Sequence, residues 1–233
     1  MVTIQIPSGK KFQAPAQLLA HHSKYFRAAL NSPMKEATAL HFDLVEHAGD
    51  EALDLFCLWL YSRPLSLGTR RILHTRANTF RHCTDILIQA WRLGDYLQAI
   101  DFKNDILFAL DTEVLRCAVD DHPFVKHSSQ LEGLDTKSSL YRMLATMLGQ
   151  VIFAQCSVDH IRKIFKAVDA DARAAVTECI ALYSAEQFDW MRQDANYESM
   201  SDKEKLRRLD ESVNGVVGVV YGVKMEDFLE ESE

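Results

Sequence analysis

Hydrophobic and polar residues alternate in three short segments near the start of the chain. Residues 2–6 read Val-Thr-Ile-Gln-Ile, a pattern that is typical of a half-buried strand. Turn residues follow at 7–10, and residues 11–14 are expected to return as the second strand of a hairpin. Residues 40–44 alternate again and predict a third strand. The pattern therefore predicts a small sheet in the first part of the chain.

Apolar residues at helical spacing dominate the remainder of the chain. Pro15 suits the first turn of one helix, and Ser23 is expected to cap the next helix at 24–30 by accepting an unpaired N–H. Asp50 is expected to cap a helix over 51–62 that is apolar on nearly every face, which indicates a buried position. The other predicted helices cover 85–97, 102–116, 158–168 and 171–183, and one more contains Leu140, Leu144, Leu148, Val151 and Ile152.

A polar segment separates two parts of the chain. Residues 117–137 hold a proline and a glycine among polar residues and are interpreted as a linker. We therefore expect an α+β domain at 1–116 and an all-helical C-terminal region at 138–212. Residues 213–233 are expected to form a short apolar segment and a frayed acidic tail.

Charge and cysteine usage argue against several classes of protein. The formal net charge is -7, with the acidic excess in the second half, whereas a general nucleic-acid binder is usually basic. The cysteines number 5 and form no CxxC pair, which indicates free thiols in a reducing compartment. The chain starts without a signal-peptide pattern, and the apolar run at 215–223 is too short to span a bilayer. We expect an intracellular protein, cytoplasmic or nuclear, without a membrane segment or specific nucleic-acid binding.

Patterns that carry catalytic or metal chemistry are missing from the sequence. The pairs His21-His22 and His82-Cys83 are adjacent, and adjacent residues on a helix do not face one another. Neither zinc-type spacing, nor a GxSxG motif, nor a glycine-rich phosphate loop occurs. The sequence therefore predicts a protein that is not an enzyme and has no metal or cofactor site. A small-molecule enzyme is the contrasting hypothesis, and a convergent polar pocket would favour it.

Several motifs, taken in order, resemble the BTB/POZ family. Residues 18–26, Leu-Leu-Ala-His-His-Ser-Lys-Tyr-Phe, are close to the family signature LLxxxSxYF. Residues 56–62, Phe-Cys-Leu-Trp-Leu-Tyr-Ser, look like the central FxxWLY helix. Residues 90–97 and 102–104 look like the paired helices that close the domain. The resemblance covers residues 2–116, and its order and spacing suit the single-BTB proteins of filamentous fungi.

The resemblance implies a small sheet with a helical cluster and a role in protein–protein interaction. Family members that recruit a cullin-type ubiquitin ligase carry a hydrophobic-x-Glu motif before a strand, and Met34 and Glu36 match it. This implies a substrate adaptor whose partner is a cullin. In the alternatives, Met34 packs on its own domain and Glu36 is solvated, and the protein is a self-associating scaffold or a transcription-linked BTB protein. The N-terminal helix that many members exchange is absent, which predicts a monomer or a weak homodimer.

The segment at 63–81 is rich in arginine and contains no acidic residue. Such a segment is a candidate binding site for an acidic protein or a phosphate group. The alternative interpretation is a solvated loop, because most charge runs are only that. Its arginines are Arg63, Arg70, Arg71, Arg76 and Arg81.

Overall fold

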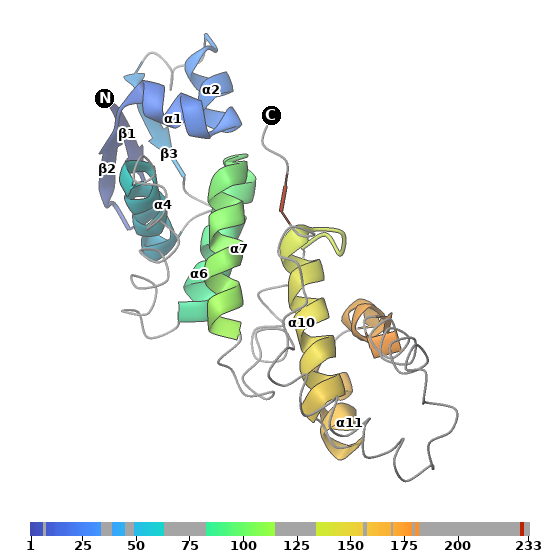
Figure 1. The fold of residues 1–233 in the computed structure, drawn as a ribbon. Coiled ribbons are helices and arrows are strands. Elements are labelled where there is room, and N and C mark those ends of the chain that lie inside the picture. The colour runs from blue at the N-terminus through green and yellow to red at the C-terminus, as the bar shows by residue number, and fades with distance from the viewer. Residues whose placement is uncertain are drawn as a thin grey trace, which may run out of the picture. The chain divides into compact units, whose positions relative to one another are not determined.

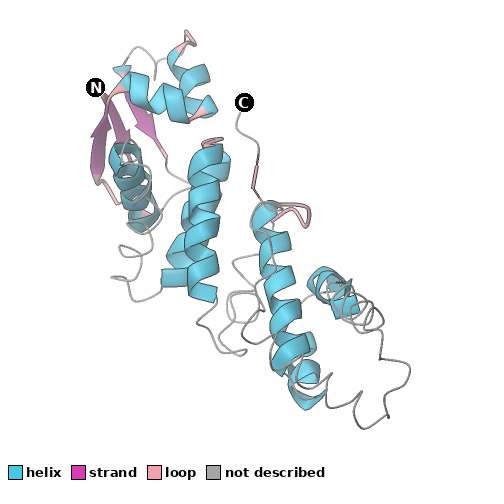
Figure 2. Ribbon diagram, in the orientation of Figure 1, coloured by secondary structure: helices cyan, strands magenta, loops and turns pink. Residues whose placement is uncertain are grey.

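The chain divides into two compact units (Figure 1), Met1–Arg116 with Leu229–Glu233 and Cys117–Phe228. The elements are a mixture of helices and strands in which helices predominate (Figure 2). The predicted α+β class is confirmed at this coarse level. The structure, a computed structural model, describes residues 1–6, 8–33, 39–44, 49–62, 83–114, 134–155, 158–168, 170–178, 180–181 and 229–230.

The first unit contains a three-stranded sheet with the strand order β2-β1-β3. Strand β1 (Val2–Gln5) pairs antiparallel with β2 (Lys11–Ala14) and parallel with β3 (His41–Asp43). Val2 and Ile4 are fully buried and their neighbours along β1 are partly exposed, so the alternation separates a core face from an outer face. The predicted strands are confirmed, although the third is shorter than predicted.

Two short helices connect β2 to β3. Helix α1 (Ala16–His22) begins after Pro15, and helix α2 (Lys24–Leu30) begins after Ser23. The Ser23 hydroxyl oxygen accepts a hydrogen bond from the Phe26 N–H at 3.1 Å. This bond satisfies one of the N–H groups that have no partner within the helix. The predicted serine cap is therefore confirmed.

The core of the first unit is built around helix α4 (Asp50–Ser62). Trp59 is fully buried, and its ring centroid lies 6.0 Å from that of Phe56 and 5.3 Å from that of Phe102. The indole N–H donates to the Asp105 carboxylate at 2.8 Å. The one polar atom of the tryptophan is thus satisfied, which makes its complete burial favourable.

Two details of the prediction for α4 are wrong. The helix is not buried on every face, because Tyr61 is 54% exposed and its hydroxyl donates to the Gln13 carbonyl at 3.0 Å. Asp50 is the first residue of α4 and not its cap. The Gly49 carbonyl instead accepts the first helical hydrogen bond, from the Leu53 N–H at 3.2 Å. Helix α4 therefore has one face in the core and one at the surface.

Helices α6 (Cys83–Tyr96) and α7 (Ile100–Val114) form an adjacent pair (Figure 1). They pack closely at Gly94, where an added Cβ would lie 2.8 Å from Lys103 Cγ and 3.0 Å from Phe102 Cδ1. Both distances are shorter than van der Waals contact, so the position requires a residue without a side chain. The pair confirms the two helices that the sequence predicts in this region.

Helices make up most of the described part of the second unit. They are α10 (Ser139–Gln155), α11 (Val158–Ala167) and the helical residues 170–178 and 180–181. Residues 115–133, most of the predicted linker, and residues 182–228 lie outside the described ranges. No helix within the described ranges is both long and apolar enough to cross a membrane. The apolar positions predicted for α10 are buried at Leu140, Leu144, Leu148 and Ile152.

The prediction of a frayed acidic tail is wrong for Glu230, whose main chain is hydrogen-bonded, while the tail on either side of residues 229–230 lies outside the described ranges. Leu229 and Glu230 belong to the first unit. Main-chain atoms of Glu230 form hydrogen bonds with the side chain of Asn104 on α7. A local sequence pattern does not reveal such a contact, because its two partners lie 126 residues apart.

Candidate functional site

The partner-binding residues that the sequence predicts lie outside the described ranges. Met34 and Glu36 fall within 34–38, and both assignments therefore stay predictions. The residues on either side are described, since Pro33 follows α2 and Leu40 precedes β3. The same holds for the arginine-rich segment, whose residues Arg63, Arg70, Arg71, Arg76 and Arg81 also lie outside the described ranges.

A groove of about 550 Å³ lies between α2 and β3. Helix α2 contributes Ala28 and Ala29, whose small side chains leave the space between helix and strand open. Strand β3 contributes the buried ring of Phe42 and the exposed carboxylate of Asp43. The volume is in the range of sites that hold a ligand or an anchoring side chain of a partner.

Tyr25 forms one wall of this groove, whereas its neighbour Phe26 belongs to the core. Phe26 is fully buried, with its ring centroid 5.3 Å from that of Phe42. Tyr25 is partly exposed and lies against Tyr96 with a centroid separation of 5.1 Å. An aromatic side chain of this kind offers a large apolar area with a polar tip, and such residues are enriched in protein interfaces.

The turn between α6 and α7 fixes the first turn of α2. The Ser23 hydroxyl donates to the Leu97 carbonyl at 2.6 Å, and the Tyr25 N–H donates to the same carbonyl at 3.3 Å. The Lys24 N–H donates to the Gln98 carbonyl at 3.5 Å. Gln98 adopts a φ of 50°, which is uncommon for a residue with a Cβ. Hydrogen bonds to two main-chain carbonyls therefore hold the start of α2, one wall of the groove, against the turn between α6 and α7.

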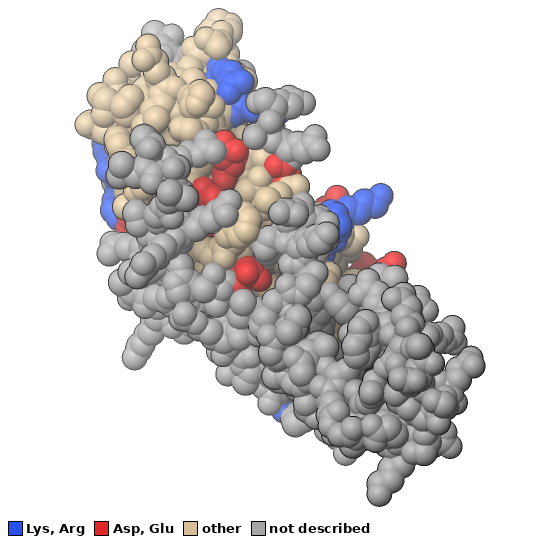
Figure 3. Space-filling model, in the orientation of Figure 1, with Lys and Arg blue, Asp and Glu red and all other residues tan. Residues whose placement is uncertain are grey.

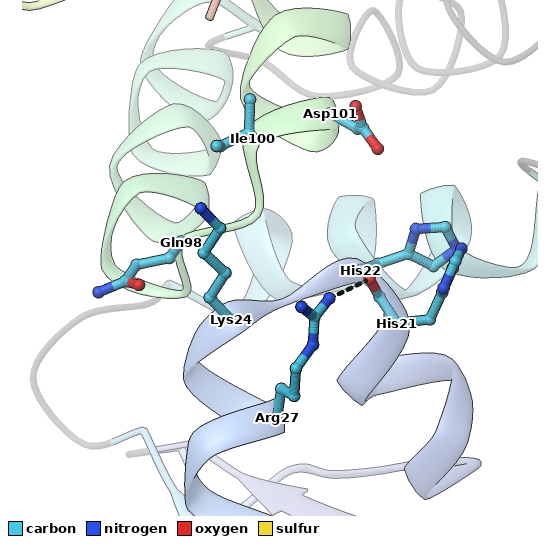
Figure 4. A pocket seen from close by; sticks show the side chains of 7 residues that line it. All are labelled: His21, His22, Lys24, Arg27, Gln98, Ile100 and Asp101. Carbon is cyan, nitrogen blue, oxygen red and sulfur yellow. Dashed lines mark hydrogen bonds between the residues drawn. The ribbon is translucent and has the colours of Figure 1, made fainter. Parts of the chain in front are cut away.

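A second, smaller hollow of about 50 Å³ lies beside the groove and shares Lys24 and Gln98 with it (Figure 4). The Arg27 guanidinium next to it donates to the carbonyls of Ala20 and His21 at 2.9 and 3.1 Å. Arg27 thus stabilises the end of α1. The hollow has room for only about one or two water molecules, which argues against a small-molecule site here. Basic side chains are visible over α2 in Figure 3, with acidic side chains over the start of α7.

Metal and thiol chemistry find little support among the described residues. No group of three or more His, Cys, Asp or Glu side chains in the described ranges is arranged to hold a metal ion. Burial, and to a lesser extent the Asp54 carboxylate, raises the pKa of Cys57 to about 12, against a smaller opposite effect of Lys10. A thiol with so high a pKa is protonated at neutral pH and is a weak nucleophile.

Cys57 is therefore expected to react slowly with iodoacetamide while the chain is folded. With the raised pKa, its thiolate fraction near pH 8 is roughly a thousandfold below that of a thiol with an ordinary pKa. Alkylation followed by peptide mass spectrometry measures the rate, and the same chain in urea supplies the reference. Equal rates in the folded and unfolded chain would contradict this environment for Cys57.

Comparison with known proteins identifies no family for this chain. No protein-family model and no curated protein matches its sequence. The function is therefore inferred from the residues and their geometry. The groove between α2 and β3 is the feature of the described residues that best suits the binding of another molecule.

Proposed function

We propose that the chain is a non-catalytic protein-interaction module. Its first unit binds another protein through a face that we call the partner face, formed by α2 and β3. The observation that carries the proposal is the groove between α2 and β3, with the partly exposed ring of Tyr25 as one wall. Ser32 lines the groove and lies two residues before Met34 in the sequence. In the sequence, the hydrophobic-x-Glu motif thus begins two residues after a residue of the groove.

We infer further that the first unit is a BTB/POZ domain. The order of its elements supports this, because two strands, two helices, a strand and a helix are followed by the pair α6 and α7. The signature residues also have physical roles that explain their order. Ser23 caps α2 and ties it to Leu97, while Phe26 and Trp59 fill the core.

The resemblance implies a cullin-type scaffold as the partner, and the protein is then a substrate adaptor of a ubiquitin ligase. A methionine in this position is an adaptable apolar anchor. The carboxylate of Glu36 then fixes the orientation of the partner by a charge-assisted hydrogen bond. The groove offers an apolar surface at Tyr25 and Ala28 for a side chain of the partner.

Met34→Ala combined with Glu36→Ala is expected to abolish co-purification with the cullin and leave the thermal midpoint nearly unchanged. Truncating a central anchor typically costs at least about 2 kcal/mol of binding free energy, which is more than tenfold in affinity. The measurement is co-purification of the two tagged proteins, with circular dichroism melting of each variant. Glu51→Ala, an exposed acidic residue on α4, is the matched control and should keep the interaction.

The alternative function is self-association without contact to a ligase. Light scattering of the full chain at micromolar concentration separates the two functions. A monomer or weak dimer together with cullin binding agrees with the adaptor. A tight dimer that survives dilution to nanomolar concentration, without cullin binding, would favour the scaffold.

A further inference from the structure

The main chain of Glu230 is held by one side chain of α7. The Asn104 side-chain N–H donates to the Glu230 carbonyl at 2.8 Å, and the Asn104 side-chain oxygen accepts from the Glu230 N–H at 3.0 Å. The amide therefore pairs with both polar main-chain groups of one residue, as a neighbouring strand does in an antiparallel sheet. This contact fixes the position and direction of the main chain at Glu230 whatever its side chain is.

The side chain of Glu230 meets a buried ammonium group. Lys103 is only 7% exposed, and its Nζ lies 2.6 Å from Glu230 Oε1 and 2.7 Å from Asp95 Oδ1. The same Nζ lies 4.7 Å from the ring centroid of Trp91. A buried charge is costly unless it is paired with opposite charge. The surroundings of Lys103 therefore favour a carboxylate at the position that Glu230 occupies.

The contacts of Lys103 allow the Glu230 side chain to be replaced by another carboxylate. The Asp95 side chain is 58% exposed, and it contacts Lys103 independently of Glu230. Lys103 thus keeps one counter-charge when the site is empty. The Glu230 side chain is itself 32% exposed, so water can reach it. The Asp95 carboxylate lowers the cost of exchanging Glu230, because the buried ammonium is never left without opposite charge.

We propose that α6 and α7 carry a binding site for an extended acidic peptide segment, and that the chain's own Leu229–Glu230 is its resident ligand. Asn104 recognises the main chain of the ligand and Lys103 recognises its carboxylate. The chain leaves the first unit after Arg116 and returns to it at Leu229. None of these residues lines the groove of the partner face.

The test uses the full chain carrying Glu230→Lys and a fluorescent peptide with the sequence of residues 225–233, Met-Glu-Asp-Phe-Leu-Glu-Glu-Ser-Glu. The charge reversal repels Lys103 and empties the site of its own segment. Fluorescence anisotropy is expected to show saturable binding of the peptide to this variant. The unsubstituted chain should bind the peptide with an affinity at least about tenfold lower, because its own segment competes. A peptide carrying Glu230→Gln should also lose about tenfold.

Asn104→Asp tests the main-chain contact, because it keeps the shape of the side chain and removes the donor to the Glu230 carbonyl. Introduced together with Glu230→Lys, it should abolish peptide binding. Asn31→Asp makes the same chemical change at an exposed residue after α2 and should have no effect. Circular dichroism reports whether each variant folds. The substituted peptide tests the site without any change in the protein beyond Glu230→Lys, so a folding defect of the Asn104 variant does not decide the outcome.

Three results would overturn the proposal. The first is the absence of saturable peptide binding at millimolar concentration. The second is equal binding by the unsubstituted and Glu230→Lys chains. The third is a dimer of the unsubstituted chain that Glu230→Lys dissociates in light scattering, since the segment would then occupy the site of a second copy.

Discussion

Trp59→Ala is expected to lower the free energy of unfolding by about 3–5 kcal/mol, as large truncations in a core do. The indole is fully buried between Phe56 and Phe102, so its removal leaves a cavity in the centre of the first unit. The substitution also removes the hydrogen bond from the indole N–H to the Asp105 carboxylate. Denaturation by urea, followed by circular dichroism, measures the change.

Trp59→Phe and Tyr61→Ala are informative controls for this measurement. The phenylalanine keeps a ring in the core and should lose less stability than the alanine. Tyr61 lies on the exposed face of the same helix, so its truncation should cost less than that of Trp59. A loss below about 1 kcal/mol for Trp59→Ala would show that α4 is peripheral to the core, against the expectation for a buried aromatic residue.

Ser23→Ala is expected to lower the free energy of unfolding by about 2–3 kcal/mol, the sum of a lost helix cap and a lost buried hydrogen bond. The hydroxyl is fully buried and acts twice, because it accepts from the Phe26 N–H and donates to the Leu97 carbonyl. Alanine removes both bonds, while threonine keeps the hydroxyl group. The same urea titration measures the effect.

Two outcomes separate the role of Ser23 from that of an ordinary surface serine. Ser8→Ala, at an exposed turn, should change stability by less than about 0.5 kcal/mol. Ser23→Thr should recover part of what alanine loses. If Ser23→Ala and Ser8→Ala behave alike, the contact between α2 and the turn at Leu97 does not stabilise the first unit.

The strands and the serine cap were predictable because their causes are local. Alternation over a few residues separates the faces of β1, and a serine before an amphipathic run is a sufficient signal for the start of α2. Burial of neighbouring aromatics was harder to predict. Tyr25 and Phe26 are both apolar, but successive residues of a helix point about 100° apart, so only one faces the core. Tyr61 on α4 is exposed for the same reason, although it follows the buried Leu60.

The groove and the peptide site depend on contacts that no local pattern records. Ala28 and Ala29 leave the groove open because they are small, and small residues on the outer side of a helix carry no signal in the sequence. The opposite wall comes from β3, and Gln98 joins from the turn between α6 and α7. The bond from Asn104 to Glu230 spans 126 residues, so only the folded chain brings these two together.

Isothermal titration calorimetry with a purified cullin scaffold tests most directly whether the partner face binds a protein. We predict saturable binding by the unsubstituted full chain at tens of micromolar. Ala28→Arg places a long side chain in the groove at an exposed position, so it should weaken binding more than tenfold, as expected for a blocked anchor site, without unfolding the chain. The absence of binding heat at tens of micromolar, or equal binding by the Ala28→Arg chain, would contradict the proposed partner face.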